Sequence, residues 1–143
     1  SSPSFIPHLT LFADLEIELN ELKNIIDRVF NNSHKFNIQK TKVSHSELFF
    51  KTVFIEFDLN EKLKDFYLKL SNKTGNRSLD DFKPHISLIY KNMPEKEKLQ
   101  IIESLNIKDN FTIGSVYINA PKNGEKDFLN ILGWQTVYKK ELI

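Results

Sequence analysis

The sequence predicts an α+β domain in which two pseudo-symmetric lobes of antiparallel sheet, with helices on their outer faces, enclose a central cleft. Two observations lead to this fold class: an eight-residue motif occurs twice, and a similar order of helix and strands follows each copy. The length agrees, because 143 residues, 40% of them hydrophobic, suit one domain with a substantial core. We therefore expect a single domain over residues 1–143, with an internal repeat of residues 5–58 and 82–140.

The repeated motif reads FIPHLTLF at residues 5–12 and FKPHISLI at residues 82–89. Phe, Pro, His and the Leu three places after His are identical in the two copies. Polar and apolar residues alternate after the Pro, which predicts a strand that begins at the Pro. Strand side chains alternate between faces, so each copy places a His and a hydroxyl residue on one face and Leu or Ile on the other.

Between the two motifs the sequence predicts helix, strand, strand and helix. Asp14 can cap a helix whose apolar residues recur at helical spacing, namely Leu15, Leu19, Leu22, Ile26 and Val29. Strands are expected over residues 36–43 and over residues 48–57, a segment rich in Phe, Val and Ile. A second helix is marked by Leu63, Phe66, Tyr67 and Leu70, and Thr74-Gly75-Asn76 ends it.

After the second motif the same order recurs. Pro94 is a good first residue for a helix that turns Leu99, Ile102 and Leu105 inward, with residues 95–98 on its wet face. A strand is expected over residues 111–118, and a tight turn at the Asn-Gly of residues 121–124. A last strand or strand pair covers residues 128–138.

The repeat is unequal at its start. A strand and a helix, residues 48–73, precede the second motif, whereas seven residues precede His8. If the halves are equivalent, an N-terminal strand and helix of roughly 30–40 residues are missing from this sequence.

The candidate catalytic residues are His8 and Thr10 in the first motif and His85 and Ser87 in the second. Two histidines with pKa values near about 6.5 can hold opposite protonation states at neutral pH, one as acid and one as base. The hydroxyls can donate hydrogen bonds to phosphoryl oxygens, where charge accumulates during reaction. If the motifs face each other across the cleft, this set suits hydrolysis of a phosphodiester.

The histidines have two other interpretations. A single His-x-Thr is a chance pattern, and a strand His is often structural, but two copies in such similar contexts favour the catalytic pair. A metal site at His8 and His85 is a weaker alternative, because the chain has no Cys and neither His has a second ligand at metal-binding spacing. We therefore expect neither metal nor cofactor.

The paired H-x-[ST] motifs resemble the 2H phosphoesterase superfamily, and their flanking residues resemble its plant and yeast cyclic nucleotide phosphodiesterase branch. The resemblance implies that His8, Thr10, His85 and Ser87 are catalytic, and that Thr10, Ser87 and Tyr90 bind substrate. It implies a small substrate, a nucleoside 2′,3′-cyclic phosphate or ADP-ribose 1″,2″-cyclic phosphate, with a 2′-phosphate left on nucleotides. It also implies a setting in RNA processing such as tRNA splicing.

Two rival functions stay open. Relatives with the same His pair act on RNA ends or 2′-5′ linked oligonucleotides, but a net charge of +1 disfavours the long basic groove that these need. Alternatively, the chain is a module that binds nucleotides or RNA ends without turnover, although binding alone needs no acid and base. We expect no membrane segment, since no apolar run approaches about 20 residues. We also expect a monomer. The lack of Cys is compatible with the cytoplasm.

Other aromatic and basic residues have weaker signals. Trp134, Tyr117 and Phe50 could stack on a base, but strand aromatics are more often core, and we assign them to the core. Four lysines near the second motif and the late turn could attract phosphate, and we assign them to ordinary surface: Lys83, Lys91, Lys122 and Lys126.

Overall fold

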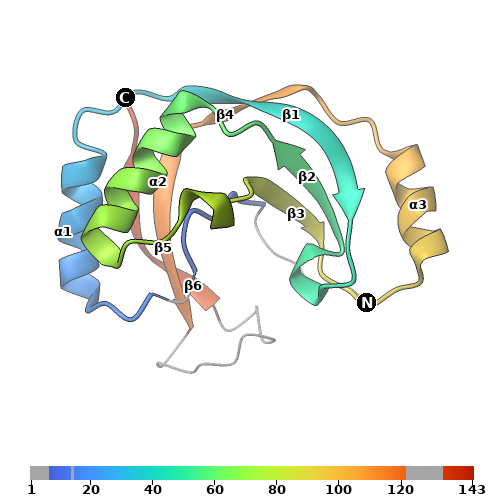
Figure 1. Cartoon of the computed structure of the whole chain (residues 1–143), viewed down its shortest axis with the longest axis horizontal. Helices are drawn as coiled ribbons and strands as arrows, with labels where there is room; N and C mark the ends of the chain where they lie inside the picture. The colour runs from blue at the N-terminus through green and yellow to red at the C-terminus, as the bar shows by residue number, and fades with distance from the viewer. Residues whose placement is uncertain (1–6, 14, 122–133) are drawn as a thin grey trace.

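The computed structural model describes residues 7–13, 15–121 and 134–143, with Pro121 and Trp134 described by their backbone alone. Within these ranges the elements follow one another along the chain as shown in Figure 1. They are α1 (Leu19–Val29), β1 (Phe36–His45), η1 (Phe49–Lys51), β2 (Val53–Phe57), α2 (Glu61–Thr74), η2 (Leu79–Asp81), β3 (His85–Ile89), α3 (Glu95–Ser104), β4 (Asn110–Ile113), β5 (Ser115–Pro121) and β6 (Trp134–Glu141), where η denotes a 3-10 turn.

Every strand pair among the described residues is antiparallel. One sheet has the order β3-β2-β1-β4, and β5 pairs with β6. The long strand β1 pairs with β4 through residues 36–39 and with β2 through residues 40–45. β1 curves over β2 and β3 in Figure 1. This arrangement confirms the predicted α+β class.

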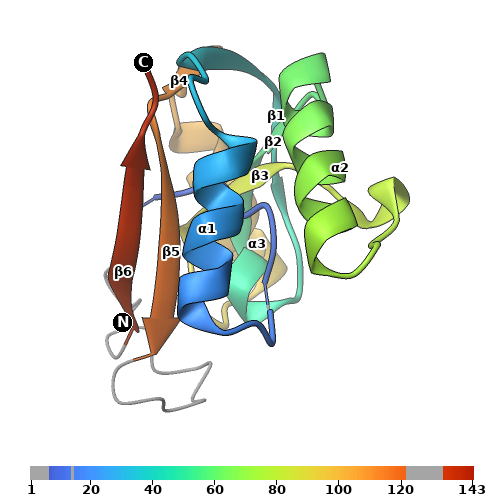
Figure 2. The same ribbon diagram turned by 90° about the vertical axis from the view of Figure 1, so that its left-hand side faces the viewer.

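Two clusters of buried apolar side chains form the core, and α2 contributes to both. One cluster joins α1, β5 and Leu142, which follows β6, and receives Phe66 and Leu70 from α2. The other lies against β1, β2 and β3, and receives Leu63 and Tyr67 from α2. In the side view the β5–β6 pair and α2 lie on opposite sides of α1 (Figure 2). The sheet face that packs on α2 carries Ile55, Phe57 and Ile86, and the opposite face carries Glu56, His85 and Ser87 together with Phe54.

Helix α1 begins later than the sequence predicts. Asp14 lies outside the described residues, and the first helical residue is Leu19. Glu18 caps this helix, because its carboxylate accepts hydrogen bonds from the amides of Asn20 at 2.9 Å and Glu21 at 3.0 Å. These two bonds lower the pKa of Glu18. Leu15 still packs against the core, but from a non-helical segment.

The predicted strand over residues 48–57 is correct only in its second half. β2 starts at Val53, and Phe49–Lys51 form the 3-10 turn η1. The hydroxyl of Thr52, which is 1% exposed, lies 2.9 Å from the carbonyl oxygen of Phe49 and 2.8 Å from that of Lys91. This hydroxyl holds the turn against the end of β3, so the chain cannot continue as a strand through Phe49.

Helix α3 presents a different face from the one predicted. Lys98, expected on the wet face, is 2% exposed, whereas Leu99, expected in the core, is 45% exposed. The Lys98 ammonium donates to the carbonyl oxygen of Ser46 at 2.7 Å and lies 3.3 Å from the carboxylate of Glu47. The polar contacts of Lys98 thus attach α3 to the loop that precedes η1.

The strand predicted over residues 111–118 is interrupted at Gly114, which separates β4 from β5. Tyr117 on β5 is 47% exposed, with the Lys139 ammonium over its ring, so its assignment to the core is wrong. The turn expected after Pro121 and the first residues of the last predicted strand lie outside the described residues, as do Lys122 and Lys126.

Candidate active site

The two motifs meet in the structure. The second forms β3, and the first touches it through a single antiparallel bridge between Leu9 and Ile86. Both bridge residues pack against the α2-facing cluster. Extending this register by one residue in each direction sets His8 opposite Ser87 and Thr10 opposite His85. The two imidazoles and two hydroxyls therefore share the face of this strand pair that points away from the core.

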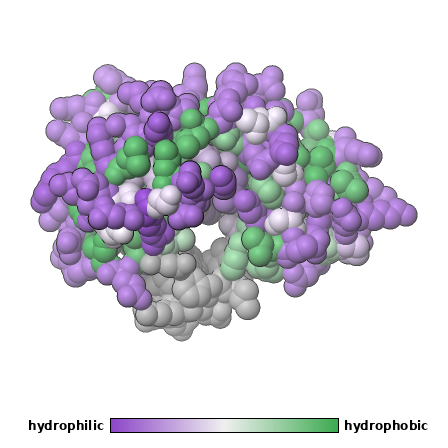
Figure 3. Space-filling model, in the orientation of Figure 1, coloured by the Kyte–Doolittle hydropathy of each residue, from purple (hydrophilic) through white to green (hydrophobic). Residues whose placement is uncertain are grey.

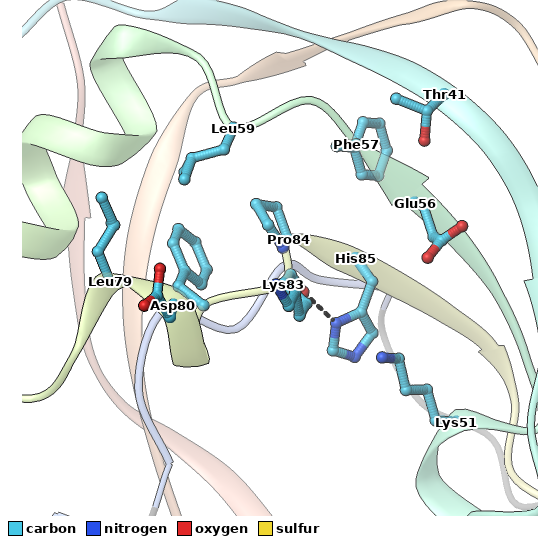
Figure 4. Close-up of a pocket in the computed structure, with 11 residues that line it drawn as sticks. Thr41, Lys51, Glu56, Phe57, Leu59, Leu79, Asp80, Lys83, Pro84 and His85 are labelled. Atoms are coloured by element: carbon cyan, nitrogen blue, oxygen red, sulfur yellow. Dashed lines mark hydrogen bonds between the residues drawn. The ribbon is translucent and has the colours of Figure 1, made fainter.

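A hydrogen bond to the backbone just before β3 orients the His85 ring. Its Nδ1 lies 2.8 Å from the carbonyl oxygen of Lys83, and because a carbonyl can only accept, Nδ1 carries the hydrogen. In the neutral ring this leaves Nε2 as the basic nitrogen. Figure 4 shows the bond and the ring edge turned away from it, toward the Lys51 ammonium.

Burial lowers the pKa of His85, and the hydrogen bond to Lys83 partly opposes this effect. The positive charges of Lys51 and His8 lower the pKa further, while the carboxylate of Glu56 raises it. Glu56 stands opposite His85 in the β2–β3 register, which explains its influence. Because the charge of His8 acts on His85, the two histidines lie within electrostatic range of each other, although they belong to different motifs.

Ser87 is buried, with 6% of its surface exposed, and its hydroxyl donates to the carbonyl oxygen of Phe50 at 2.7 Å. Tyr90 forms a side-chain hydrogen bond with Ser87 that lowers the Tyr90 pKa, but burial raises that pKa more strongly. The Tyr90 ring packs on Phe49 and Phe50 at centroid distances of 6.2 and 5.3 Å. Both Ser87 and Tyr90 are thus tied to η1.

A β-bulge explains why Tyr90 reaches Ser87. Phe54 pairs with Ser87 but the adjacent Val53 pairs with Ile89, so Leu88 is an extra residue in β3. The extra residue inverts the alternation of faces beyond it, which brings Tyr90 to the side that carries Ser87. Without the bulge a residue three places after Ser87 would point to the opposite face.

Two cavities adjoin His85. One, of about 330 Å³, extends toward Glu56, Leu79 and Asp80, and the other, of about 370 Å³, extends toward Thr10, Tyr67 and Arg77. The residues that line both are Lys51, Phe82, Lys83 and His85. Figure 3 shows that the molecule is hollowed near the middle of the face drawn in Figure 1. A ligand with its phosphate beside His85 therefore has room on either side.

Sequence reasoning missed Lys51, which lines both cavities. The signal was present, because Lys51 is the only charged residue between Glu47 and Glu56, in a segment that is otherwise mostly apolar. It also missed Arg77, whose guanidinium lies 5.2 Å from the Phe12 ring centre and donates to the carbonyl oxygen of Ala13 at 2.9 Å. No pattern in the sequence distinguishes Arg77 from a surface arginine.

The remaining predicted residues lie as follows. Lys83 is exposed, as expected, but also lines both cavities. Phe50 is 38% exposed and packs edge-on against Tyr90 rather than inside the core. Within residues 7–13, 15–121 and 134–143, no group of three or more His, Cys, Asp or Glu side chains is placed to hold a metal ion. No helix in these ranges is long and apolar enough to cross a membrane.

The chain is similar to known proteins in sequence and in fold. The chain is 22% identical over 98 residues to a cyclic phosphodiesterase of Arabidopsis thaliana, an alignment that covers 68% of this chain and 54% of the relative. It thus spans about half the length of that curated relative. The fold is similar to that of Escherichia coli LigT, solved in complex with 3′-AMP, with a TM-score of 0.53 and 14% identity over 95% of this chain and 75% of LigT.

A family model described as cyclic phosphodiesterase-like protein matches residues 1–131, which include both motifs. The resemblance to 2H phosphoesterases drawn from the motifs is confirmed by this match and by the Arabidopsis relative, and LigT shares the fold. The chain therefore belongs to the cyclic phosphodiesterase-like protein family.

Proposed function

We propose that this protein hydrolyses a cyclic phosphodiester of a nucleotide, without a metal, using His8 and His85 as an acid–base pair. The substrate class is a nucleoside 2′,3′-cyclic phosphate or ADP-ribose 1″,2″-cyclic phosphate, as family membership suggests. The observation that carries the proposal is the bridge between Leu9 and Ile86, which supports a common face for the two histidines. His85 lines both cavities and Thr10 lines one of them, whereas His8, Ser87 and Tyr90 line neither.

His85 is the base in this proposal. Its Nδ1 hydrogen is engaged by the Lys83 carbonyl, so Nε2 can take a proton from the attacking water. Burial and the nearby positive charges lower the pKa of His85, which keeps the ring neutral at pH 7. The water oxygen then forms a bond to phosphorus while the proton moves to Nε2.

His8 is the acid. It is exposed, and a positive charge on His8 disfavours protonation of His85. For this mechanism, His8 must carry the proton when His85 is neutral. As the bond between phosphorus and the leaving oxygen breaks, His8 gives its proton to that oxygen. Cleavage of the bond between phosphorus and the 3′ oxygen leaves a 2′-phosphate and a 3′-hydroxyl on a nucleotide. Exchange with solvent then restores a protonated His8 and a neutral His85.

The hydroxyls and the tyrosine bind the phosphoryl group. Thr10 is exposed and lines the cavity on the Arg77 side, where it can donate to a non-bridging oxygen. Ser87 and Tyr90 are proposed as further contacts, and Ser87 must exchange its bond to the Phe50 carbonyl for one to phosphate. We also propose that residues 5–58 and 82–140 are two copies of an internal repeat, each with one motif, whose strands combine in the sheet β3-β2-β1-β4.

The test is turnover of 2′,3′-cyclic AMP in excess chelator, followed by phosphorus NMR. His8→Ala and His85→Ala should each lower kcat/KM by about two to four orders of magnitude, as expected for loss of an acid or a base. His34→Ala is the matched control, since His34 is exposed and lies outside both motifs. Activity that survives in both motif variants, or that chelator abolishes, contradicts the proposal, and tight binding without product identifies a binding module.

A further inference from the structure

We propose that Lys51 is a further catalytic residue, whose ammonium contacts a non-bridging oxygen of the reacting phosphoryl group beside His85. This inference rests on the proposed function of the site and adds a residue that lies in neither motif. It also assigns a cation to the developing negative charge, which the hydroxyls contact only as neutral donors.

The first support is where the ammonium lies. Lys51 lines both cavities, and Figure 4 shows its side chain reaching from η1 toward the His85 ring. The ammonium is 4.5 Å from the centre of the Phe54 ring, and His85 packs edge-on against the same ring at 5.7 Å between centroids. Phe54 therefore supports both side chains on the site face. The charge of Lys51 also lowers the pKa of His85, which agrees with their proximity.

The second support is that the backbone of η1 is held in place by hydroxyl groups. The carbonyl oxygens of its three residues each lie within hydrogen-bond distance of a side-chain hydroxyl: Phe49 with Thr52, Phe50 with Ser87 and Lys51 with Ser46. Lys98, which is buried, donates in turn to the carbonyl oxygen of Ser46. A lysine on such a segment reaches the site from a fixed backbone, so less conformational entropy is lost when it binds phosphate.

The third support is the negative charge that the phosphoryl group gains during the reaction. Ser87, one of the two motif hydroxyls, already donates to the Phe50 carbonyl and is 6% exposed. The substrate diester carries one negative charge, and attack by a deprotonating water adds a second. A cation beside phosphorus therefore stabilises the transition state more than the bound substrate, which raises kcat rather than only lowering KM.

The test compares Lys51→Met, which keeps the length and apolar stem over Phe54, with Lys51→Arg, which keeps the charge. Lys51→Met should lower kcat for 2′,3′-cyclic AMP by about 100- to 1000-fold with a smaller change in KM, and Lys51→Arg should recover most of this loss. Lys69→Met is the control, because it removes the same charge from an exposed ion pair with Asp65 on α2. A Lys51→Met enzyme with kcat within threefold of the Lys69→Met enzyme overturns the inference.

The pH–rate profile gives a second readout, which a merely structural lysine would not move in this direction. The charged groups that act on His85 are Lys51 from η1, Glu56 from β2 and His8 from the first motif. Removing the Lys51 charge lets the pKa of His85 rise, so the acid limb of the profile should move to higher pH in Lys51→Met and stay in place in Lys51→Arg. An unmoved acid limb contradicts direct proximity of the two groups.

Binding of adenosine 2′-monophosphate separates this inference from the proposed function. If the unaltered protein turns over no cyclic nucleotide, the proposed function fails. Calorimetry then still tests Lys51: weaker binding in Lys51→Met but not in Lys69→Met retains Lys51 as a phosphate contact. Equal binding in both variants, or no binding by the unaltered protein, overturns the inference itself.

Discussion

Removing the hydroxyl of Thr52 should destabilise the protein, because this group holds η1 against the end of β3. Thr52 is 1% exposed, accepts a hydrogen bond from the Lys91 amide at 3.1 Å, and shares its own hydrogen between the carbonyl oxygens of Phe49 and Lys91. Thr52→Val keeps the shape and the β-branch but removes all of these bonds. A buried amide without a partner costs about 1–3 kcal/mol, and the two carbonyls add a smaller amount that the new methyl partly offsets. We expect a loss of about 1.5–3 kcal/mol in the free energy of unfolding.

The assay is urea unfolding followed by circular dichroism, with Thr112→Val as the control. Thr112 is exposed on β4 and its hydroxyl donates to the side-chain oxygen of Asn37 at 2.8 Å, so the same chemical change there should cost less than about 0.5 kcal/mol. In thermal scans the Thr52→Val loss corresponds to roughly 5–10 °C in Tm for a domain of this size.

The reasoning is refuted if Thr52→Val and Thr112→Val unfold at the same urea concentration with unchanged m-values. That result would mean that the hydroxyl of Thr52 contributes no more than a solvated one. A change in m-value for Thr52→Val alone would instead point to a different unfolded or native ensemble, and the free energies would then not be comparable.

Three further predictions concern the backbone, pH and the core. Gly75, at the end of α2, has φ of +137°, so Gly75→Ala should cost about 1–2 kcal/mol in urea unfolding, whereas Gly114→Ala, whose added Cβ would meet only Lys35 at 3.9 Å, should change stability by less than half as much; equal effects would rule out backbone strain. Burial lowers the pKa of His85, so between that value and about 6.5 the unfolded chain binds more protons; stability should therefore fall as the pH falls through this window, and His85→Asn should lose that part of the dependence. Phe66→Ala removes a ring that contacts Phe30 and Phe36 at 4.4 and 5.6 Å and should cost about 3–5 kcal/mol by calorimetry; a loss below about 1 kcal/mol would mean that the core closes around the missing ring.

The sequence was informative where a local pattern also decides the packing. The apolar spacing of Leu63, Phe66, Tyr67 and Leu70 predicts α2, all four side chains are buried, and Gly75 ends the helix as expected. β3 and the second motif follow from the alternation around His85 in the same way. These elements needed no partner from elsewhere in the chain to be recognised.

It was misleading where a distant contact decides. The sequence predicts a solvated Lys98, yet its side chain is buried and donates a hydrogen bond to the Ser46 carbonyl oxygen, 52 residues earlier. The residues Phe49 and Phe50 are typical of a strand, but they form η1 and pack on the ring of Tyr90. A β-bulge in β3 places Tyr90 on that side. For the same reason Lys51 gave only a faint signal, since its place beside His85 depends on that turn.

The way α2 divides its side chains has a mechanical consequence. Successive positions along one helix, Leu63, Phe66, Tyr67 and Leu70, alternate between the two apolar clusters. The helix cannot detach from one cluster while remaining seated in the other, so damage to either half of the molecule is transmitted to its counterpart. Melting should accordingly register as one sharp event whichever half carries the reporter.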